Sequence, residues 1–221
     1  MKLKMLIVLS LVLGVITFTD ACGQEFGVMG GLNISSLTGR VYSSPTAGFV
    51  AGGYMRYEFS GGWSLEPEIL FSMKGGYMSE ESAANLPVTE GLYVPMTGVL
   101  TLDYIEVPVL LDVPALKLPF LSAKLDVFAG PAFAANVISR QEIREYYNNS
   151  WHSFTSNSSN GIQWFNFNLA IGGGPTFNLG TTNLGIEVRY TISPWSAVNT
   201  GFPSSHAWNN NVWSIMARMS L

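Results

Sequence analysis

Two histidines and one cysteine are the side chains that could carry nucleophilic or metal chemistry in this 221-residue chain. His152 is followed by Ser153, and His206 is preceded by Ser205, so each imidazole has a hydroxyl beside it in the sequence. Nucleophilic catalysis needs a serine, a base and an acid held within hydrogen-bond reach on rigid elements. Both pairs instead fall in predicted external loops. We therefore expect no catalytic site, and such scattered ligands predict no metal site.

A run of three glycines, Gly172 to Gly174, is the remaining candidate for cofactor chemistry. Glycine-rich loops bind phosphate where a strand leads into a helix N-terminus. No helical periodicity follows this run, so the glycines favour strand bending or space inside a barrel. The sequence predicts no cofactor.

The composition is apolar and poor in charge, with 48% hydrophobic residues, 12% charged residues and a formal net charge of -4. An acidic balance without a basic run does not fit a nucleic-acid partner. One cysteine also excludes a disulfide framework. This composition is unusual for a soluble enzyme.

The first residues have the features of an export signal. Two lysines precede an apolar stretch from Met5 to Phe18, and small residues precede Gln24. The stretch is too short for a bilayer-spanning helix, which needs about 20 apolar residues. We predict a signal peptide over residues 1–23 and one mature domain over residues 24–221. Cys22 is either removed or lipidated, and both outcomes imply export.

Beyond the signal, apolar and polar residues alternate with a period of two. From Trp63 to Lys74 the odd positions are wholly apolar, whereas the even positions carry three charges. In a strand these two sets face opposite sides of the sheet. The sequence predicts eight such strands, near residues 26–34, 47–59, 63–74, 104–112, 124–134, 163–178, 184–192 and 212–221.

The two faces of these strands differ in charge. One face holds none, and the other holds Arg56, Glu58, Glu66, Glu68, Lys74, Glu106, Asp112, Lys124, Asp126, Glu187, Arg189 and Arg218. A soluble barrel would cover its exterior with charge, but here the polar face is mostly Gly, Ala, Ser and Asn. The pattern favours a barrel whose apolar face meets lipid. An exported soluble barrel that binds a ligand is an alternative.

The connections between the strands also alternate in length. One end has connections near 35–46, 75–98, 139–162 and 193–210, and the other end has shorter ones near 60–62, 113–123 and 179–183. Long external loops and short periplasmic turns are typical of outer-membrane barrels. We predict an all-β fold, an eight-stranded antiparallel up-and-down transmembrane β-barrel preceded by a signal peptide, in the outer membrane of a Gram-negative bacterium.

Five segments resemble strands of the PorT-like outer-membrane β-barrel family, small barrels of Bacteroidetes-type Gram-negative bacteria. They are Phe26–Ser35, Asp103–Leu111, Phe128–Ala132, Leu169–Gly174 and Leu184–Tyr190. The resemblance implies an eight-stranded barrel in the outer membrane. It implies no chemistry, although the family's namesake is tied to a protein secretion system and gliding.

The chain departs from the family pattern at two positions. Met29 stands where a lysine is frequent, and the chain ends in Leu221 rather than an aromatic residue. The alternation from Trp213 to Leu221 still resembles the C-terminal signal that the barrel-assembly machinery reads. The resemblance therefore implies this machinery as a partner during insertion.

An eight-stranded barrel is narrow enough for side chains to fill it. If Phe59 pairs with Trp63 across a tight turn, Arg56 lies opposite Glu66, and opposite charges at such a pair attract. Glu187 and Arg218, on the last two strands, are a second candidate pair. We predict a lumen charge network of Arg56, Glu58, Glu66, Glu68, Glu106, Glu187, Arg189 and Arg218. The alternative is a set of solvated lumen charges that contribute little.

These features predict an integral outer-membrane barrel with a largely packed polar lumen and long external loops. We expect it to act in envelope interaction or assembly rather than catalysis, with a narrow porin-like channel for ions or small solutes as the alternative. The expected partners are outer-membrane lipids and lipopolysaccharide, the barrel-assembly machinery, and an envelope or extracellular protein. If the network holds, Arg56→Ala damages folding more than Arg40→Ala in a loop.

Overall fold

A computed structural model of the chain describes residues 24–38, 44–59, 61–78, 96–118, 123–147, 150–156, 162–194, 198–199 and 207–221. The predicted signal peptide, residues 1–23, lies outside the described residues. The strands are β1 (Gln24–Thr38), β2 (Thr46–Glu58), β3 (Ser64–Met78), β4 (Met96–Leu118), β5 (Ala123–Tyr147), β6 (Ser150–Ser156), β7 (Phe165–Asn178), β8 (Asn183–Ile192), β9 (Val198–Asn199) and β10 (Ala207–Ser220).

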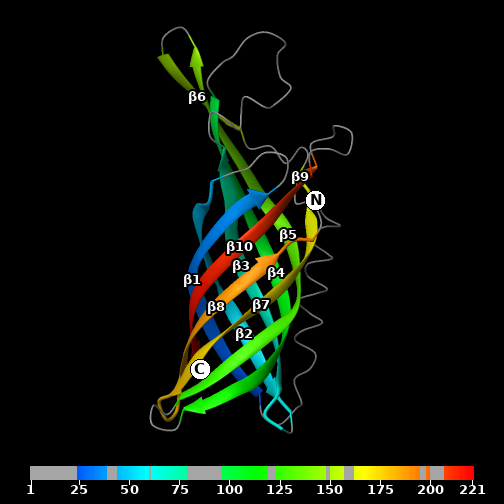
Figure 1. Ribbon diagram of the computed structural model, residues 1–221, viewed down its shortest axis with the longest axis vertical. Helices are drawn as coiled ribbons and strands as arrows, with labels where there is room; N and C mark the ends of the chain where they lie inside the picture. The colour runs from blue at the N-terminus through cyan, green and yellow to red at the C-terminus, as the bar shows by residue number, and fades with distance from the viewer. Residues whose placement is uncertain are drawn as a thin grey trace.

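Eight long strands form a closed barrel, tilted as in Figure 1. Each pairs antiparallel with its neighbours in the order β1-β2-β3-β4-β5-β7-β8-β10, and β1 pairs with β10 to close the sheet. β6 adds to β5 outside this ring, and the short β9 pairs with β10. The predicted eight-stranded antiparallel barrel is confirmed.

The pleat separates the residues of the barrel wall by polarity. Leu32 is 65% exposed and Val188 is 45% exposed on the outer face, whereas Glu66 and Arg189 are 1% and 3% exposed inside. The apolar face therefore points outward and the charged face points into the lumen, as the alternation predicts. Among the described residues, no helix is long and apolar enough to cross a membrane.

One end of the barrel, here called the turn end, has short connections. The β2–β3 turn is closed by a hydrogen bond from the Phe59 amide to the Trp63 carbonyl at 2.7 Å. Gly61, Gly62 and Gly180 have φ values of +97°, +83° and +97°, which favour glycine in these turns. The paired part of β4 and β5 extends to Leu118 and Ala123, so the connection predicted over 113–123 is too long.

The opposite end, here called the hairpin end, differs more from the prediction. β5 continues to Tyr147 and turns back as β6, so the loop predicted over 139–162 is wrong for residues 139–147 and 150–156. This hairpin projects beyond the ring of strands at the upper end of Figure 1. β3 reaches Met78 and β4 starts at Met96, which narrows the predicted 75–98 loop to residues 79–95.

A β-bulge explains why the β5 extension is hard to see in the sequence. Tyr104 pairs with Asn136 but Asp103 pairs with Ile138, which leaves Val137 as an extra residue in β5. An extra residue reverses which parity class faces outward. Below the bulge, even positions such as Ala134 face inward, and above it Ser139 does, so alternation traced from the turn end stops at this point.

Candidate functional site

The lumen concentrates the charges of the barrel wall on its inner face. Seven of the eight predicted network residues are buried there: Arg56, Glu66, Glu68, Glu106, Glu187, Arg189 and Arg218. Glu58 differs, because its side chain is 56% exposed near the turn end, with Oε1 3.8 Å from Arg56 Nε. Buried charges need partners, because an unpaired buried ion carries a large desolvation cost.

At the turn end, Arg56 of β2 lies between two carboxylates. Its Nη2 is 3.2 Å from Asp112 Oδ1 of β4, and its Nη1 is 3.8 Å from Glu66 Oε2 of β3. Pairing of Tyr57 with Leu65 and of Glu58 with Ser64 gives the β2–β3 register that the turn predicts. The Arg56–Glu66 contact thus follows from the hairpin, whereas Asp112 comes from the next strand along the sheet.

Arg218 of β10 extends the network across the lumen. Its Nη2 donates to Glu66 Oε2 at 2.5 Å, and its Nη1 lies 3.5 Å from Glu187 Oε2 on the neighbouring β8. The guanidinium also sits 4.2 Å from the centroid of the Tyr54 ring, within the range of a cation–π contact. The expected Glu187–Arg218 neighbours are in contact, but the shorter contact of Arg218 is with Glu66.

Arg189 and Glu68 form the most regular pair in the lumen. Arg189 Nη1 and Nη2 donate to the two oxygens of Glu68, each at 2.7 Å, which is the bidentate geometry that guanidinium and carboxylate favour. Arg189 Nη2 also lies 2.8 Å from Glu187 Oε1. Its guanidinium carbon is 5.2 Å from the centroid of the Phe128 ring, which packs against it.

These contacts join into one chain of alternating charge. It runs through Asp112, Arg56, Glu66, Arg218, Glu187, Arg189 and Glu68, with every neighbouring pair within 3.8 Å. The chain begins and ends on a carboxylate, so each guanidinium lies between two acids. We call these seven residues the charge chain.

Towards the hairpin end, Lys74 of β3 pairs with Glu106 of β4. Glu106 was expected in the network, but Lys74 and Asp112 were not named in it, although both belong to the charged face of their strands. Between Lys74 and Arg189 a cavity leaves about 10 Å³ for the centres of water molecules, which is room for about one of them. The cavity is therefore too small to be an aqueous channel.

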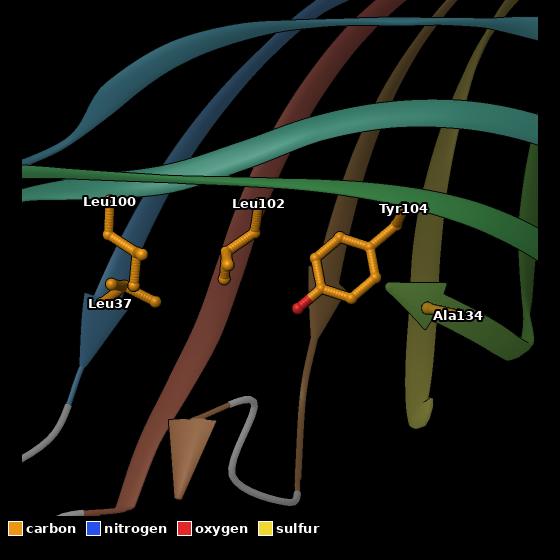
Figure 2. Packing of buried hydrophobic residues seen from close by; sticks show 5 residues of the cluster. All are labelled: Leu37, Leu100, Leu102, Tyr104 and Ala134. Atoms are coloured by element: carbon orange, nitrogen blue, oxygen red, sulfur yellow. The ribbon is translucent and has the colours of Figure 1, made fainter. Parts of the chain in front are cut away.

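Apolar side chains close the lumen beyond this cavity. Leu37, Leu100, Leu102, Tyr104 and Ala134 form a buried cluster, contributed by β1, β4 and β5. Figure 2 shows these side chains gathered on the inner side of the strands. A polar layer next to them is also bonded, since Asn33 donates to Ser72 Oγ at 3.0 Å and accepts from Ser214 at 2.7 Å. Charge, amide and apolar layers thus fill the lumen in turn.

The predicted histidine–serine pairs form no catalytic arrangement among the described residues. His152 Nε2 lies 2.9 Å from Ser150 Oγ on the exposed β6, and its sequence neighbour Ser153 points to the other face of that strand. His206 lies outside the described residues. In the part of the chain that the structure describes, no group of three His, Cys, Asp or Glu side chains could hold a metal ion.

Comparisons with known proteins concern the sequence and the fold. Residues 23–193 match the family described as "Outer membrane protein beta-barrel domain". Neisserial surface protein A (NspA) is similar in structure at 13% identity and a TM-score of 0.46, over 89% of this chain and 98% of that chain. OprG from Pseudomonas aeruginosa gives 12% identity, a TM-score of 0.46 and coverage of 89% and 94%. Ail, the attachment invasion locus protein of Yersinia pestis, gives 14%, 0.41, 90% and 100%. No curated protein matches the sequence.

Proposed function

Because this chain belongs to the outer membrane protein beta-barrel domain family, we propose that it is a closed membrane anchor that presents the β5–β6 hairpin to the cell exterior. Membership of the family indicates residence in the outer membrane of a Gram-negative bacterium. The proposed role is envelope interaction or assembly, without catalysis and without transport through the lumen. The observation that carries this proposal is the charge chain, which fills the lumen where a channel would need water.

The charge chain favours a plug over a pore for an energetic reason. An ion that moves through the lumen must separate Arg189 from Glu68 or Arg218 from Glu66, and both members of each pair are buried. Leaving one member of a buried pair without its partner costs about 3–5 kcal/mol. The apolar cluster around Leu102 adds a second barrier, because it offers no polar group to replace water around an ion.

The hairpin supports the external half of the proposal. β6 pairs with β5 over seven residues, and Trp151 and Phe154 on it are 51% and 57% exposed. Long extracellular extensions and short periplasmic turns are the usual polarity of outer-membrane barrels. The hairpin end then faces outside, and the turn with Gly61 faces the periplasm.

Three finer assignments belong to the same proposal. The chain is a PorT-like barrel, on the strand motifs given above. Residues 1–23 are a signal peptide that leaves a single barrel domain over residues 24–221. The alternating C-terminal strand, with Trp213 and Ile215 exposed on the outer face, serves as the signal for the barrel-assembly machinery.

Planar-bilayer conductance tests the closed lumen. The purified full chain should give no steady openings, and an open outer-membrane porin in the same bilayers provides the positive control. Steady openings with a defined conductance would overturn the plug and favour a narrow channel. A chain that stays soluble without detergent after signal removal would instead favour an exported soluble barrel.

Cysteine labelling tests the orientation. In a Cys22→Ser background, Thr155→Cys on β6 should react with a membrane-impermeant maleimide in whole cells. Thr181→Cys at the turn end is the matched control, because it is also exposed but should react only after the outer membrane is opened. The reverse pattern would show that the hairpin faces the periplasm and would contradict the proposal.

A further inference from the structure

The outward face of the β5–β6 hairpin continues the outer surface of the barrel but changes its chemistry. Below the bulge this surface is aliphatic, with Val127 45% exposed and Ile138 49% exposed at its upper limit. Above it the same face carries Arg140, whose Nη2 lies 3.1 Å from Asp103 Oδ2. The lipid-facing surface of the β5 strand therefore ends between Ile138 and Arg140.

Three cross-strand pairs make up this face above Arg140. Glu142 pairs with Thr155, Arg144 with Ser153 and Tyr146 with Trp151, and side chains two residues apart along each strand share the face. We call these six residues the hairpin face. It contains one aromatic pair, one pair of opposite charges and two hydroxyls, with no aliphatic side chain. Such a surface is unsuited to acyl chains.

The aromatic pair offers a flat, supported ring. The centroids of Tyr146 and Trp151 are 5.4 Å apart at an interplanar angle of 59°, so the tyrosine holds the indole at a fixed inclination. Trp151 remains 51% exposed. Aromatic side chains bind at low conformational cost, because few torsions become ordered on contact.

The charged pair supplies directed hydrogen bonds beside this ring. Arg144 Nε and Nη2 donate to Glu142 Oε1 at 3.3 and 3.1 Å, which fixes the plane of the guanidinium on the exposed face. A guanidinium has five N–H donors and a carboxylate has two acceptor oxygens, so this pair retains capacity for a ligand. Its charges cancel, which gives no attraction for a polyanion.

From these features we propose that the hairpin face binds a neutral pyranose in the saccharide part of neighbouring lipopolysaccharide. The C–H face of a sugar ring stacks on an indole, and its hydroxyl groups need both donors and acceptors. The next row along the strands, Arg144 and Ser153, lies about 7 Å from the aromatic row, which suits the rim of one sugar ring. This inference rests on the proposed function, which places the hairpin outside the cell.

The position of the face selects this source of saccharide. It points sideways, in the same direction as the lipid-facing surface below it, rather than over the lumen. Tyr146 follows Ile138 by eight residues, which is about 26 Å along the strand. The molecules that stand beside the barrel at this height are the sugars linked to the outer-leaflet lipids.

Saturation-transfer NMR on the full chain in detergent micelles tests the proposal. The probe is a core oligosaccharide released by mild acid from rough-type lipopolysaccharide. Trp151→Ala should weaken its binding by about fivefold or more, as expected for loss of an aromatic platform. Phe154→Ala is the matched control, because Phe154 is an exposed aromatic residue of the same strand but lies on the opposite face, and its binding should stay within about twofold of the wild type.

Heat-modifiable mobility in gels verifies that both variants are folded. Absence of binding to the wild type, or equal binding by the Trp151→Ala variant, would overturn the proposed site. Equal or tighter binding of lacto-N-tetraose, a neutral glycan that lipopolysaccharide lacks as a free chain, would overturn the assignment to neighbouring lipopolysaccharide. The conductance and labelling experiments do not depend on Trp151, so failure of this proposal is distinguishable from failure of the proposed function.

Discussion

Arg189 and Glu68 meet across the lumen through two hydrogen bonds of 2.7 Å, although 121 residues separate them in the sequence. Arg189 enters from β8 and Glu68 from β3, which are not neighbours in the sheet. Their contact exists only when the barrel is closed. The pair therefore connects closure of the sheet to burial of charge.

A double-mutant cycle should show this dependence. Arg189→Gln leaves the buried Glu68 carboxylate without its bidentate partner, which should lower the free energy of unfolding by about 3–5 kcal/mol. Adding Glu68→Gln should restore part of that loss, because the second substitution removes the uncompensated charge. Urea unfolding in detergent, followed by heat-modifiable mobility, measures each variant. Strictly additive losses would show that the two side chains do not interact.

The Arg56 prediction can be tested against a control that the structure describes. Arg56 is 3% exposed and contacts Asp112 and Glu66, whereas the side chain of Arg144 is 63% exposed. Arg56→Ala should shift the unfolding midpoint well below that of the wild type, and Arg144→Ala should leave it nearly unchanged, because exposed ion pairs contribute about 0–1 kcal/mol. Arg40, the control suggested by sequence, lies outside the described residues. Equal midpoints for both variants would mean that the lumen charges are solvated.

Salt should affect the two kinds of ion pair differently. Solvent-exposed pairs are screened over about 8–10 Å at ordinary ionic strength, but buried pairs are screened much less. The loss caused by Arg56→Ala should therefore remain when the salt concentration rises from about 0.05 to 0.5 M. Unfolding curves of the wild type and the variant at both concentrations provide the measurement. A loss that disappears at high salt would place Arg56 in contact with water.

Local patterns predicted the barrel, and the reason is visible in individual strands. The alternation from Trp63 to Lys74 indicates which side chains face outward, and the tight turn at Gly61 sets the register that brings Arg56 to Glu66. The Arg189–Glu68 contact has no local signal, because it depends on strand tilt and closure. Lys74 belongs to the charged face in the sequence, but its pairing with Glu106 required the register of β3 and β4.

The hairpin could not be predicted in this way because of a single residue. Val137 interrupts the alternation of β5, and the β6 residues are exposed on both faces, so neither feature gives a period of two in hydrophobicity. Ser- and Asn-rich composition then favours a loop. The side chains of the hairpin face were consequently assigned to a connection and their shared orientation was missed.

Deletion of Val137 should separate the hairpin from the barrel experimentally. Without the extra residue, one parity class continues through β5, so Arg140 turns toward the lumen and Ser139 turns outward. Arg140 then loses Asp103, which is 2% exposed and would be left with a buried charge. We expect the barrel to keep its heat-modifiable mobility while residues 139–156 become sensitive to protease in whole cells. Val137→Ala is the control, because it keeps the bulge and should preserve the resistance of the hairpin. A deletion variant as resistant as the control would mean that the bulge does not set the orientation of the hairpin.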